Sequence, residues 1–491
     1  MTWSIVASLF QPHHLLLALG GNILGIVFGA IPGLSASTAL ALLLPLSFSM
    51  PPETGIIFLG NIWIGGVSGG LIASILLGIP GSPSSIATTY DGYPMTLKGQ
   101  SVKALGVGII SSFIGTIGSC VVAYLFCPIL ARWAVKLGPW ELFSLCFCAI
   151  ILVVTISKGN MWNGLIAAFF GMLLSTVGFA PIDGAKRFSF GIMSISGGLN
   201  LLALVLGLFA MGSFVHSLGK GDLVNPDVDT KVSGFGVTLK EFVDNIGLII
   251  KSFIIGLWIG FLPGMGSGLS NMVAYASAKS SSKEPEKFGT GCIEGVFASE
   301  VSNNAAVGGA IIPMIALGIP GDTPTSLLLG GLMIHGIEAG PLLLTNSANF
   351  VYTFFATVFF AAILTLLLQY FGMRSFPLML KLPYHYLYSA IAVICFVGAY
   401  SDTNSLTNCW LMLFFVAISL FLVYGKFPTA PLILGFILGP MLESNLRKGL
   451  TYADTGILSF FTRPISCVLL LFAFASLFFP LIRSKMDKKK Q

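Results

Sequence analysis

The fold is decided by two short stretches that repeat almost letter for letter, "LGIPGSPSS" at 77–85 and "LGIPGDTPTS" at 317–326. Each interrupts a long apolar run with Gly-Ile-Pro-Gly and then supplies hydroxyl side chains. A proline inside a helix removes a backbone hydrogen bond and clashes with the preceding turn. Each stretch therefore predicts a helix that breaks in the middle of an apolar segment and resumes with polar residues.

The surrounding composition is that of a membrane protein. Of the 491 residues, 55% are hydrophobic and 9% are charged, whereas a soluble domain carries roughly 25% charged residues. A helical span needs about 20 apolar residues, and the chain holds about a dozen such stretches. Barrel strands would be shorter and would alternate in polarity. We expect an all-α polytopic membrane protein with about 12 transmembrane segments and Pro-Gly-broken helices or re-entrant hairpins.

The charges near the termini predict topology. The first basic residue is Lys98, so the start "MTWSIVASLFQPHH" (1–14) has no charged region typical of a cleavable signal peptide. The end "RSKMDKKKQ" (483–491) holds five basic residues and one acid, which by the positive-inside rule predicts a cytoplasmic C-terminus. Most of the net charge of +6 lies in this tail. It indicates membrane orientation and not binding to nucleic acid.

Cysteine and histidine give no sign of a metal site. The eight cysteines are scattered through apolar stretches without Cys-x-x-Cys motifs, and the five histidines show no ligand spacing either. We interpret the cysteines as small core residues. The sequence predicts no metal and no cofactor.

The broken stretches belong to an internal duplication. "IVFGAIPGLSAS" (26–37) matches "LWIGFLPGMGSG" (257–268) with an offset of 231, and the Leu-Gly-Ile-Pro-Gly motifs have an offset of 240. The polar insertion "SSSKEPEKF" (280–288) accounts for the nine extra residues. We expect two repeated halves, 1–225 and 226–491, joined by a polar linker at 219–236. The number of crossings in each half, and hence a parallel or inverted repeat, stays open.

Four breaks, two in each half, predict a binding site. Freed backbone groups in lipid cost several kcal/mol unless protein or water satisfies them, so broken helices belong around a cavity. Half-helix N-termini present N–H groups and a positive dipole end, which together with hydroxyls suit a carboxylate. The alternative is that the breaks only kink helices for close packing. The candidate substrate-binding residues directly follow the four breaks: Gly33, Ser35, Ser37, Gly81, Ser82, Ser84, Ser85, Gly264, Ser267, Gly321, Thr323 and Thr325.

Other polar residues near the breaks are candidates for a coupling ion or a further substrate contact. Asp322 follows the second Gly-Ile-Pro-Gly motif, and Asn303 and Asn304 precede it in "EVSNNAAVGG" (300–309). Polar and ionisable residues inside a membrane segment are functional candidates by default.

The chain resembles the TctA-like family, the large membrane subunit of the tripartite tricarboxylate transporters. The residues that carry the resemblance are "GAIPGLSAS" (29–37), "GIPGSPSSIATTYDGYPMTLKGQ" (78–100), "LPGMG" (262–266) and "GIPGDTPTSLLLGGLMIHGIEAGP" (318–341). The resemblance implies a multi-pass protein of the bacterial inner membrane that imports organic anions such as citrate or related carboxylates. It further implies coupling to a sodium or proton gradient, a small membrane subunit of about four helices, and a periplasmic solute-binding protein.

Rival functions remain to be weighed. A standalone carboxylate transporter or an ion channel would use the same breaks. An intramembrane serine hydrolase would need a base beside a serine, and no His or Lys stands in a repeated place near the breaks. Nucleotide binding through "GMGSG" (264–268) fails because the Lys-Ser/Thr end of a P-loop is missing. We expect a transporter and not an enzyme.

Overall fold

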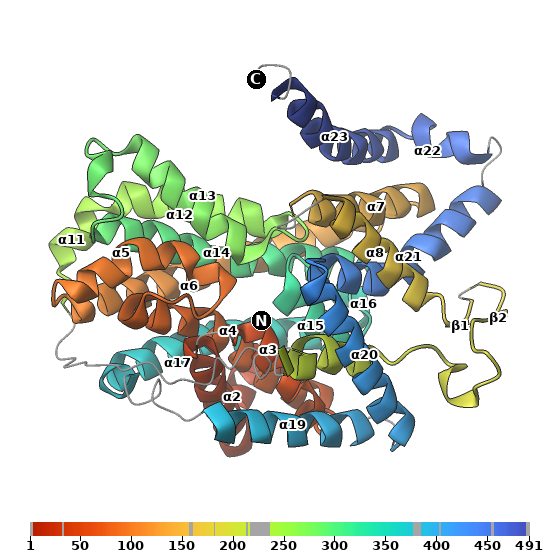
Figure 1. Cartoon of the computed structure of the whole chain (residues 1–491), viewed down its shortest axis with the longest axis horizontal. Helices are drawn as coiled ribbons and strands as arrows, with labels where there is room; N and C mark the ends of the chain where they lie inside the picture. The colour runs from red at the N-terminus through yellow and green to blue at the C-terminus, as the bar shows by residue number, and fades with distance from the viewer. Residues whose placement is uncertain are drawn as a thin grey trace.

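The computed structural model describes residues 3–31, 34–156, 161–180, 182–212, 215–216, 236–376, 384–401, 404–452 and 456–487 (Figure 1). Within these residues the chain is almost entirely helical, and the one strand pair is a short antiparallel ribbon that joins Gly178 to Arg187. The expected all-α class is confirmed. The linker at 219–236 and the boundary between 225 and 226 lie outside the described residues except for Gly236.

The first part of the chain forms the following elements: α1 (Trp3–Leu9), α2 (Pro12–Ala30), α3 (Ala36–Leu43), η1 (Leu44–Ser47), α4 (Pro52–Leu77), η2 (Pro83–Ser85), α5 (Ile86–Leu97), α6 (Ser101–Ala134), α7 (Pro139–Ile156), α8 (Met161–Ser175), β1 (Gly178–Phe179), β2 (Lys186–Arg187), η3 (Met193–Ile195), α9 (Leu201–Val205) and the π-helical turn η4 (Leu206–Met211).

The second part forms these elements: α11 (Leu239–Asp244), α12 (Ile246–Phe261), α13 (Gly266–Ser281), η5 (Pro285–Lys287), α14 (Ile293–Leu317), α15 (Thr323–Ile334), α16 (Leu343–Asn346), α17 (Ala348–Gly372), η6 (Met373–Ser375), α19 (Tyr384–Ser401), α20 (Leu406–Tyr424), α21 (Thr429–Thr451), η7 (Gly456–Leu458), α22 (Ser459–Thr462) and α23 (Pro464–Asp487).

Several helices can cross a bilayer. Among the described residues, α2, α4, α6, α17, α20 and α21 are long and apolar enough, and α22 with α23 forms a seventh candidate that is bent by 90°. Other apolar helices, including α3 with η1, α12 and α15, have only 10 to 17 residues, fewer than a straight span needs. The chain is therefore a multi-pass membrane protein, and the expected total of about 12 spans stays a prediction.

Helices α4 and α14 form the centre of the molecule. Helix α4 is buried from Thr54 to Leu76 and α14 from Gly295 to Leu317. Helices α2 and α17 pack against α4, while α6, α12 and α13 pack against α14. The two expected halves therefore interlock, because α6 of the first half covers α14 and α17 of the second covers α4. Burial by protein explains why α14 is less apolar than a lipid-facing span.

Glycines bring the central helices into close contact. A Cβ atom at Gly25 of α2 would lie 2.3 Å from the carbonyl oxygen of Ile62 in α4. A Cβ atom at Gly256 of α12 would lie 2.3 Å from the carbonyl oxygen of Ser302 in α14. The two contacts are related by the offsets of the sequence motifs, since 256 minus 25 is 231 and 302 minus 62 is 240. Small residues at these positions permit backbone contact between helices.

The two Gly-Ile-Pro-Gly motifs end their helices in the same way. Gly78 after α4 has a φ of 67°, and Gly318 after α14 has a φ of 72°. This left-handed conformation favours glycine and stops an α-helix. Each break is followed by a helix of 12 residues, α5 or α15. The expected helix breaks are thus present at both motifs.

Candidate functional site

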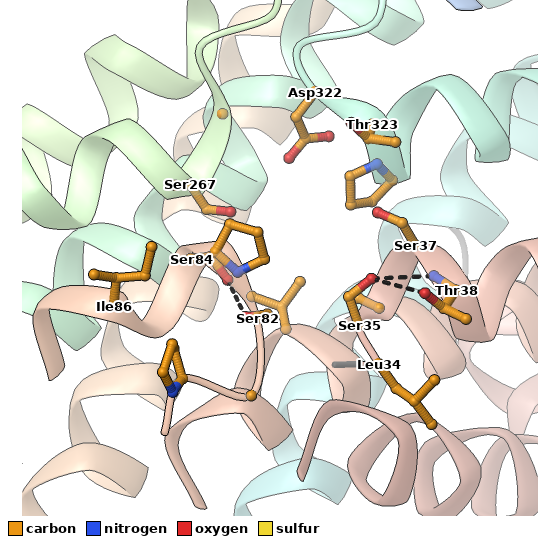
Figure 2. A pocket seen from close by; sticks show the side chains of 18 of the residues that line it. Leu34, Ser35, Ser37, Thr38, Ser82, Ser84, Ile86, Ser267, Asp322 and Thr323 are labelled. Carbon is orange, nitrogen blue, oxygen red and sulfur yellow. Dashed lines mark hydrogen bonds between the residues drawn. The ribbon is translucent and has the colours of Figure 1, made fainter. Parts of the chain in front are cut away.

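The helices that follow the four breaks meet at one cavity. Its volume is about 610 Å³, within the range of small-molecule sites. The labelled side chains in Figure 2 come from the starts of α3, η2, α5, α13 and α15. The described residues that line the cavity are Leu34, Ser35, Ala36, Ser37, Thr38, Val67, Pro80, Gly81, Ser82, Pro83, Ser84, Ile86, Phe209, Gly264, Met265, Gly266, Ser267, Gly268, Asp322, Thr323, Pro324 and Thr429.

The start of α13 is the most open of these helix N-termini. Ser35 caps α3 by accepting a hydrogen bond from the Thr38 N–H at 3.2 Å, and Asp322 caps α15 through the Thr325 N–H at 3.0 Å. Met265 precedes α13 and provides no side-chain cap. The first turn of α13 then presents Gly266, Ser267 and Gly268 to the cavity. Uncapped N–H groups beside small residues allow an anion to approach the helix end closely.

The hydroxyls in the cavity differ in how far they are already engaged. The Ser82 and Ser84 hydroxyls lie 2.7 Å apart and hydrogen-bond to each other (Figure 2). Within the described parts of the chain, the hydroxyls of Ser37, Ser267 and Thr323 have no protein partner. These last three come from three different helix starts and are available to a ligand.

Fixed positive charge comes from helix ends and not from basic side chains. No Lys, Arg or His is among the described residues that line the cavity. Four helix N-termini each carry roughly half a positive charge. The carboxylate of Asp322 also lines the cavity, and its Oδ1 accepts hydrogen bonds from the N–H and the hydroxyl of Thr325 at 3.0 and 2.7 Å. The arrangement suits an anion with several oxygen atoms.

The structure brings most of the candidate residues together. The following line the cavity: Ser35, Ser37, Gly81, Ser82, Ser84, Gly264, Ser267, Thr323 and Asp322. Gly33 lies outside the described residues. Ser85, Gly321 and Thr325 are adjacent in sequence but do not line the cavity.

Ser85 and Thr325 stabilise the breaks instead. The Ser85 hydroxyl accepts a hydrogen bond from the Ser82 N–H at 3.2 Å and donates to the Ser82 carbonyl at 3.0 Å. The Thr325 hydroxyl accepts a hydrogen bond from the Asp322 N–H at 2.9 Å, and its one proton lies between the Asp322 carbonyl at 3.0 Å and the Asp322 Oδ1 at 2.7 Å. Both hydroxyls are fully buried. A side chain three residues into a helix folds back on the cap and so points away from the cavity.

Gly81 and Gly321 are required for packing. A Cβ atom at Gly81 would lie 2.4 Å from the carbonyl oxygen of Gly29, and one at Gly321 would lie 2.7 Å from that of Gly260. The Gly321 carbonyl accepts a hydrogen bond from the Gly264 N–H at 2.7 Å. The N–H of Gly264 is therefore engaged by the protein, so the groups left for a ligand are those later in the first turn of α13.

Asn303 and Asn304 lie elsewhere. They are fully buried on α14 in a polar cluster around Glu300, where Asn304 Oδ1 accepts hydrogen bonds from Ser68 and Thr116 at 3.1 and 3.3 Å. Neither residue lines the cavity. The structure thus separates them from the hydroxyls with which they were grouped as possible substrate contacts.

Other cavity residues have no signal in the sequence. Val67 lies in the middle of α4, Phe209 in the turn η4, and Thr429 at the start of α21. Phe209 and Thr429 are far along the chain from the nearest Pro-Gly break, and Val67 is separated from Pro80 by most of the second half of α4. Only the folded chain brings them to the cavity.

Comparison with known proteins decides the family. The model of the "Tripartite tricarboxylate transporter TctA family" matches residues 15–434. The chain belongs to the tripartite tricarboxylate transporter TctA family. It is thus a subunit of a transporter with partner subunits.

Two relatives come from Agrobacterium vitis. One is described as an uncharacterized 52.8 kDa protein in the TAR-I ttuC′ 3′ region; it is 32% identical over 481 residues, which cover 97% of this chain and 95% of that protein. The other is described as an uncharacterized protein in the TAR-II ttuC′ 3′ region; it is 33% identical over 236 residues, which cover 48% of this chain and 98% of that protein. No solved structure matches the chain.

Proposed function

We propose that the chain is the large membrane subunit of a secondary active transporter that imports organic anions, tricarboxylates such as citrate or related carboxylates, across the bacterial inner membrane. A periplasmic solute-binding protein delivers the substrate, and a small membrane subunit of about four helices completes the complex. A sodium or proton gradient drives uptake. The observation that carries the proposal is the meeting of four helix N-termini at one hydroxyl-lined cavity.

The chemistry of the cavity favours a carboxylate over a cation. Helix N-termini attract negative charge, and hydroxyl donors solvate carboxylate oxygens in place of water. A cation would need several carboxylate or carbonyl oxygens, and Asp322 is the one acid among the described lining residues. Hydrolysis is disfavoured because no His or Lys of the described lining can activate a serine.

The architecture suggests how the site is assembled. Residues 1–225 and 226–491 form two related halves in this proposal, and each contributes two broken helices. Helix α3 packs against α15, and α13 packs against η2 and α5, so breaks from both halves face each other. A relative movement of these elements would open the cavity to alternate sides of the membrane. The basic C-terminal tail lies in the cytoplasm.

Uptake in vesicles tests the proposal. The chain is reconstituted with and without the two partner subunits, and labelled di- and tricarboxylates are offered under separate sodium and proton gradients. We expect saturable, gradient-driven uptake that requires the partners. Uptake without partners would identify a standalone transporter, and non-saturable flux would identify a channel. No carboxylate flux under either gradient, with all subunits present, would refute the proposal.

A further inference from the structure

A carboxyl group lies buried in the centre of the molecule, apart from the substrate cavity. Glu300 on α14 is 0% exposed. Thr88 of α5 donates a hydrogen bond to its Oε1 at 2.5 Å. Its Oε2 accepts longer hydrogen bonds from Ser112 of α6 at 3.3 Å, and from Asn303 and Asn304 at 3.4 Å each. The hydrogen bonds to the carboxyl group thus all come from neutral hydroxyl and amide groups.

No basic side chain in the described parts of the chain forms an ion pair with this group. Among the described residues, the ion pairs of the chain involve other acids, and none includes Glu300. A buried carboxylate without a counter-charge costs several kcal/mol. Neutral hydrogen-bond donors reduce that cost only in part. The group therefore requires a cation, either a proton on the carboxyl group or a metal ion beside it.

Unpaired amide oxygens stand close to the same cluster. Asn303 Oδ1 and both polar atoms of the Gln369 side chain are buried without a hydrogen-bond partner in the described parts of the chain. Gln369 shares a narrow space with Ser68, Ser112 and Thr116, and this space has no room for a water molecule. Unpaired buried amides are rare and costly. Here they supply oxygen ligands that a small cation could use where water cannot enter.

The cluster is linked to the substrate cavity through α5. Thr88 lies one helical turn after Ser84, which lines the cavity. Asn271 of α13 donates a hydrogen bond to the Ser84 carbonyl, and its own buried Oδ1 has no hydrogen-bond partner among the residues that the structure describes. Thr88 thus connects the Glu300 carboxyl group to the segment of η2 and α5 that carries the cavity hydroxyls of Ser82 and Ser84.

The duplication supplies this carboxyl group only once. With the offset of 240, Glu300 corresponds to Gly60 of α4, because 300 minus 240 is 60. The substrate cavity draws on both halves, whereas the carboxyl group belongs to one. Such an asymmetric group is not required by the repeated packing.

The remaining titratable groups on the elements packed against α14 have their own partners or face elsewhere. Asp91 of α5 binds Tyr275 of α13 and three backbone N–H groups, and Lys103 of α6 pairs with Glu241. Lys251 of α12 binds Ser277 and Ser281. The others are Tyr90 and Tyr93 on α5, Cys120, Tyr124, Cys127 and Arg132 on α6, Lys279 on α13, Glu53 on α4, Glu294 on α14 itself, and two residues next to helices, Asp322 before α15 and Cys292 before α14.

We propose that Glu300, with Thr88, Ser112 and Asn303, forms the binding site of the coupling cation, a sodium ion or a proton. Cation binding neutralises the carboxylate and through Thr88 fixes the start of α5 in its substrate-binding position. The role in coupling rests on the proposed transport function, whereas cation binding at Glu300 is a property of the chain alone.

Thermal unfolding of the purified chain in detergent tests cation binding without transport. Sodium chloride is exchanged for choline chloride at constant ionic strength, at a mildly acidic and a mildly alkaline pH. A cation at ten times its Kd should raise the midpoint by about 2 °C. A rise with sodium identifies the sodium ion, and a rise at acidic pH without sodium identifies the proton. Glu300→Gln should abolish either response.

Glu141→Gln is the matched control. Glu141 is also buried, but its Oε2 accepts a hydrogen bond from the Gly138 N–H at 2.9 Å, which a glutamine oxygen can replace. This variant should keep the wild-type response. Should Glu300→Gln not fold, Thr88→Ala retains the carboxyl group and should raise the cation concentration for half effect several-fold. The assignment would be overturned if the wild type responded to neither cation. It would also be overturned if Glu300→Gln, or Thr88→Ala when Glu300→Gln does not fold, kept the wild-type response.

Transport by the complete complex tests coupling. Glu300→Gln should lose gradient-driven accumulation and keep exchange of internal for external substrate, because glutamine resembles the neutral, cation-loaded state. Gradient-driven accumulation equal to wild type would overturn the coupling role. A wild-type complex that moves no carboxylate would instead refute the proposed function, and the thermal response would still report cation binding at Glu300.

Discussion

Removing the free cavity hydroxyls should weaken substrate binding without harming the fold. Ser37 and Ser267 are the second residues of α3 and α13, and neither hydroxyl has a protein partner among the described residues. A hydrogen bond to a charged group contributes about 1.5–3 kcal/mol. The cavity is open to water, so we take the lower limit. Ser37→Ala and Ser267→Ala should each raise the half-saturating substrate concentration roughly tenfold.

The double variant tests whether the two helices bind one ligand. The serines lie on different elements and share no hydrogen bond, so their losses should add. The sum of about 3 kcal/mol corresponds to a roughly 150-fold higher half-saturating substrate concentration. The assay is initial-rate uptake by the reconstituted complex over a range of substrate concentrations, with the amount of folded chain in the vesicles measured in parallel.

Ser252→Ala provides the control. The Ser252 hydroxyl is buried in α12 without a hydrogen-bond partner in the described parts of the chain, so its removal leaves no unpaired group. The half-saturating substrate concentration of Ser252→Ala should stay within about twofold of the wild-type value. Single cavity variants that also stay within this limit would refute the assignment of these hydroxyls to the substrate. A double variant no weaker than the singles would refute simultaneous contact.

Three further predictions concern the framework. Gly81→Ala should abolish uptake, because its Cβ would lie 2.4 Å from a backbone carbonyl, whereas Gly268→Ala has no contact closer than 3.6 Å and should keep wild-type amounts of folded protein in the membrane. The Lys103 ammonium and the cap at Thr238 lower the pKa of Glu241 to about 2. The ionised Glu241 therefore stabilises the fold above its ordinary pKa near 4.5, and this stabilisation is lost as pH falls toward 2. The stability of Glu241→Gln should depend less steeply on pH over this range, and near neutral pH the variant should be less stable by about 1 kcal/mol. Asp91→Ala should lower the thermal midpoint more than Asp91→Asn, because alanine leaves three partly buried backbone donors and a buried tyrosine hydroxyl unpaired.

The positions of the breaks could be predicted from sequence because their causes are local. Gly78 and Gly318 adopt the left-handed conformation that glycine tolerates, and the following proline prevents the helix from continuing. The duplication indicated that the polar segments after the breaks form a set. It did not say which hydroxyls face the cavity, because that depends on the helical phase after each cap.

For Ser85 and Thr325, the position after the helix cap already indicates in the sequence where the hydroxyl points. Both stand three residues after a capping Ser or Asp, in the spacing of a capping box. That pattern predicts a side chain that folds back on the helix start, and both hydroxyls do so. The sequence therefore held a signal against these two residues as ligands, which the hydroxyl count alone concealed.

The cluster on α14 required the tertiary structure. Glu300, Asn303 and Asn304 share a helical face by their spacing, but the sequence does not say what that face contacts. In the structure the face meets Ser112 and Thr116 of α6. A contact between segments almost 200 residues apart cannot be read from local patterns.

The convergence of four helix N-termini explains why one of them carries an acid. Positive helix ends repel one another, so a cavity that gathers them is unfavourable until negative charge enters. Asp322 supplies part of that charge at the start of α15, where its Oδ1 is held by the N–H and hydroxyl of Thr325. The starts of α3 and η2 carry serines, and α13 has no side-chain cap. Three helix ends therefore keep their attraction for an external anion, while the fourth is neutralised from within the chain. A second acid at the cavity would compete with a carboxylate substrate. Without any acid, the repulsion between the helix ends would make the empty cavity less stable.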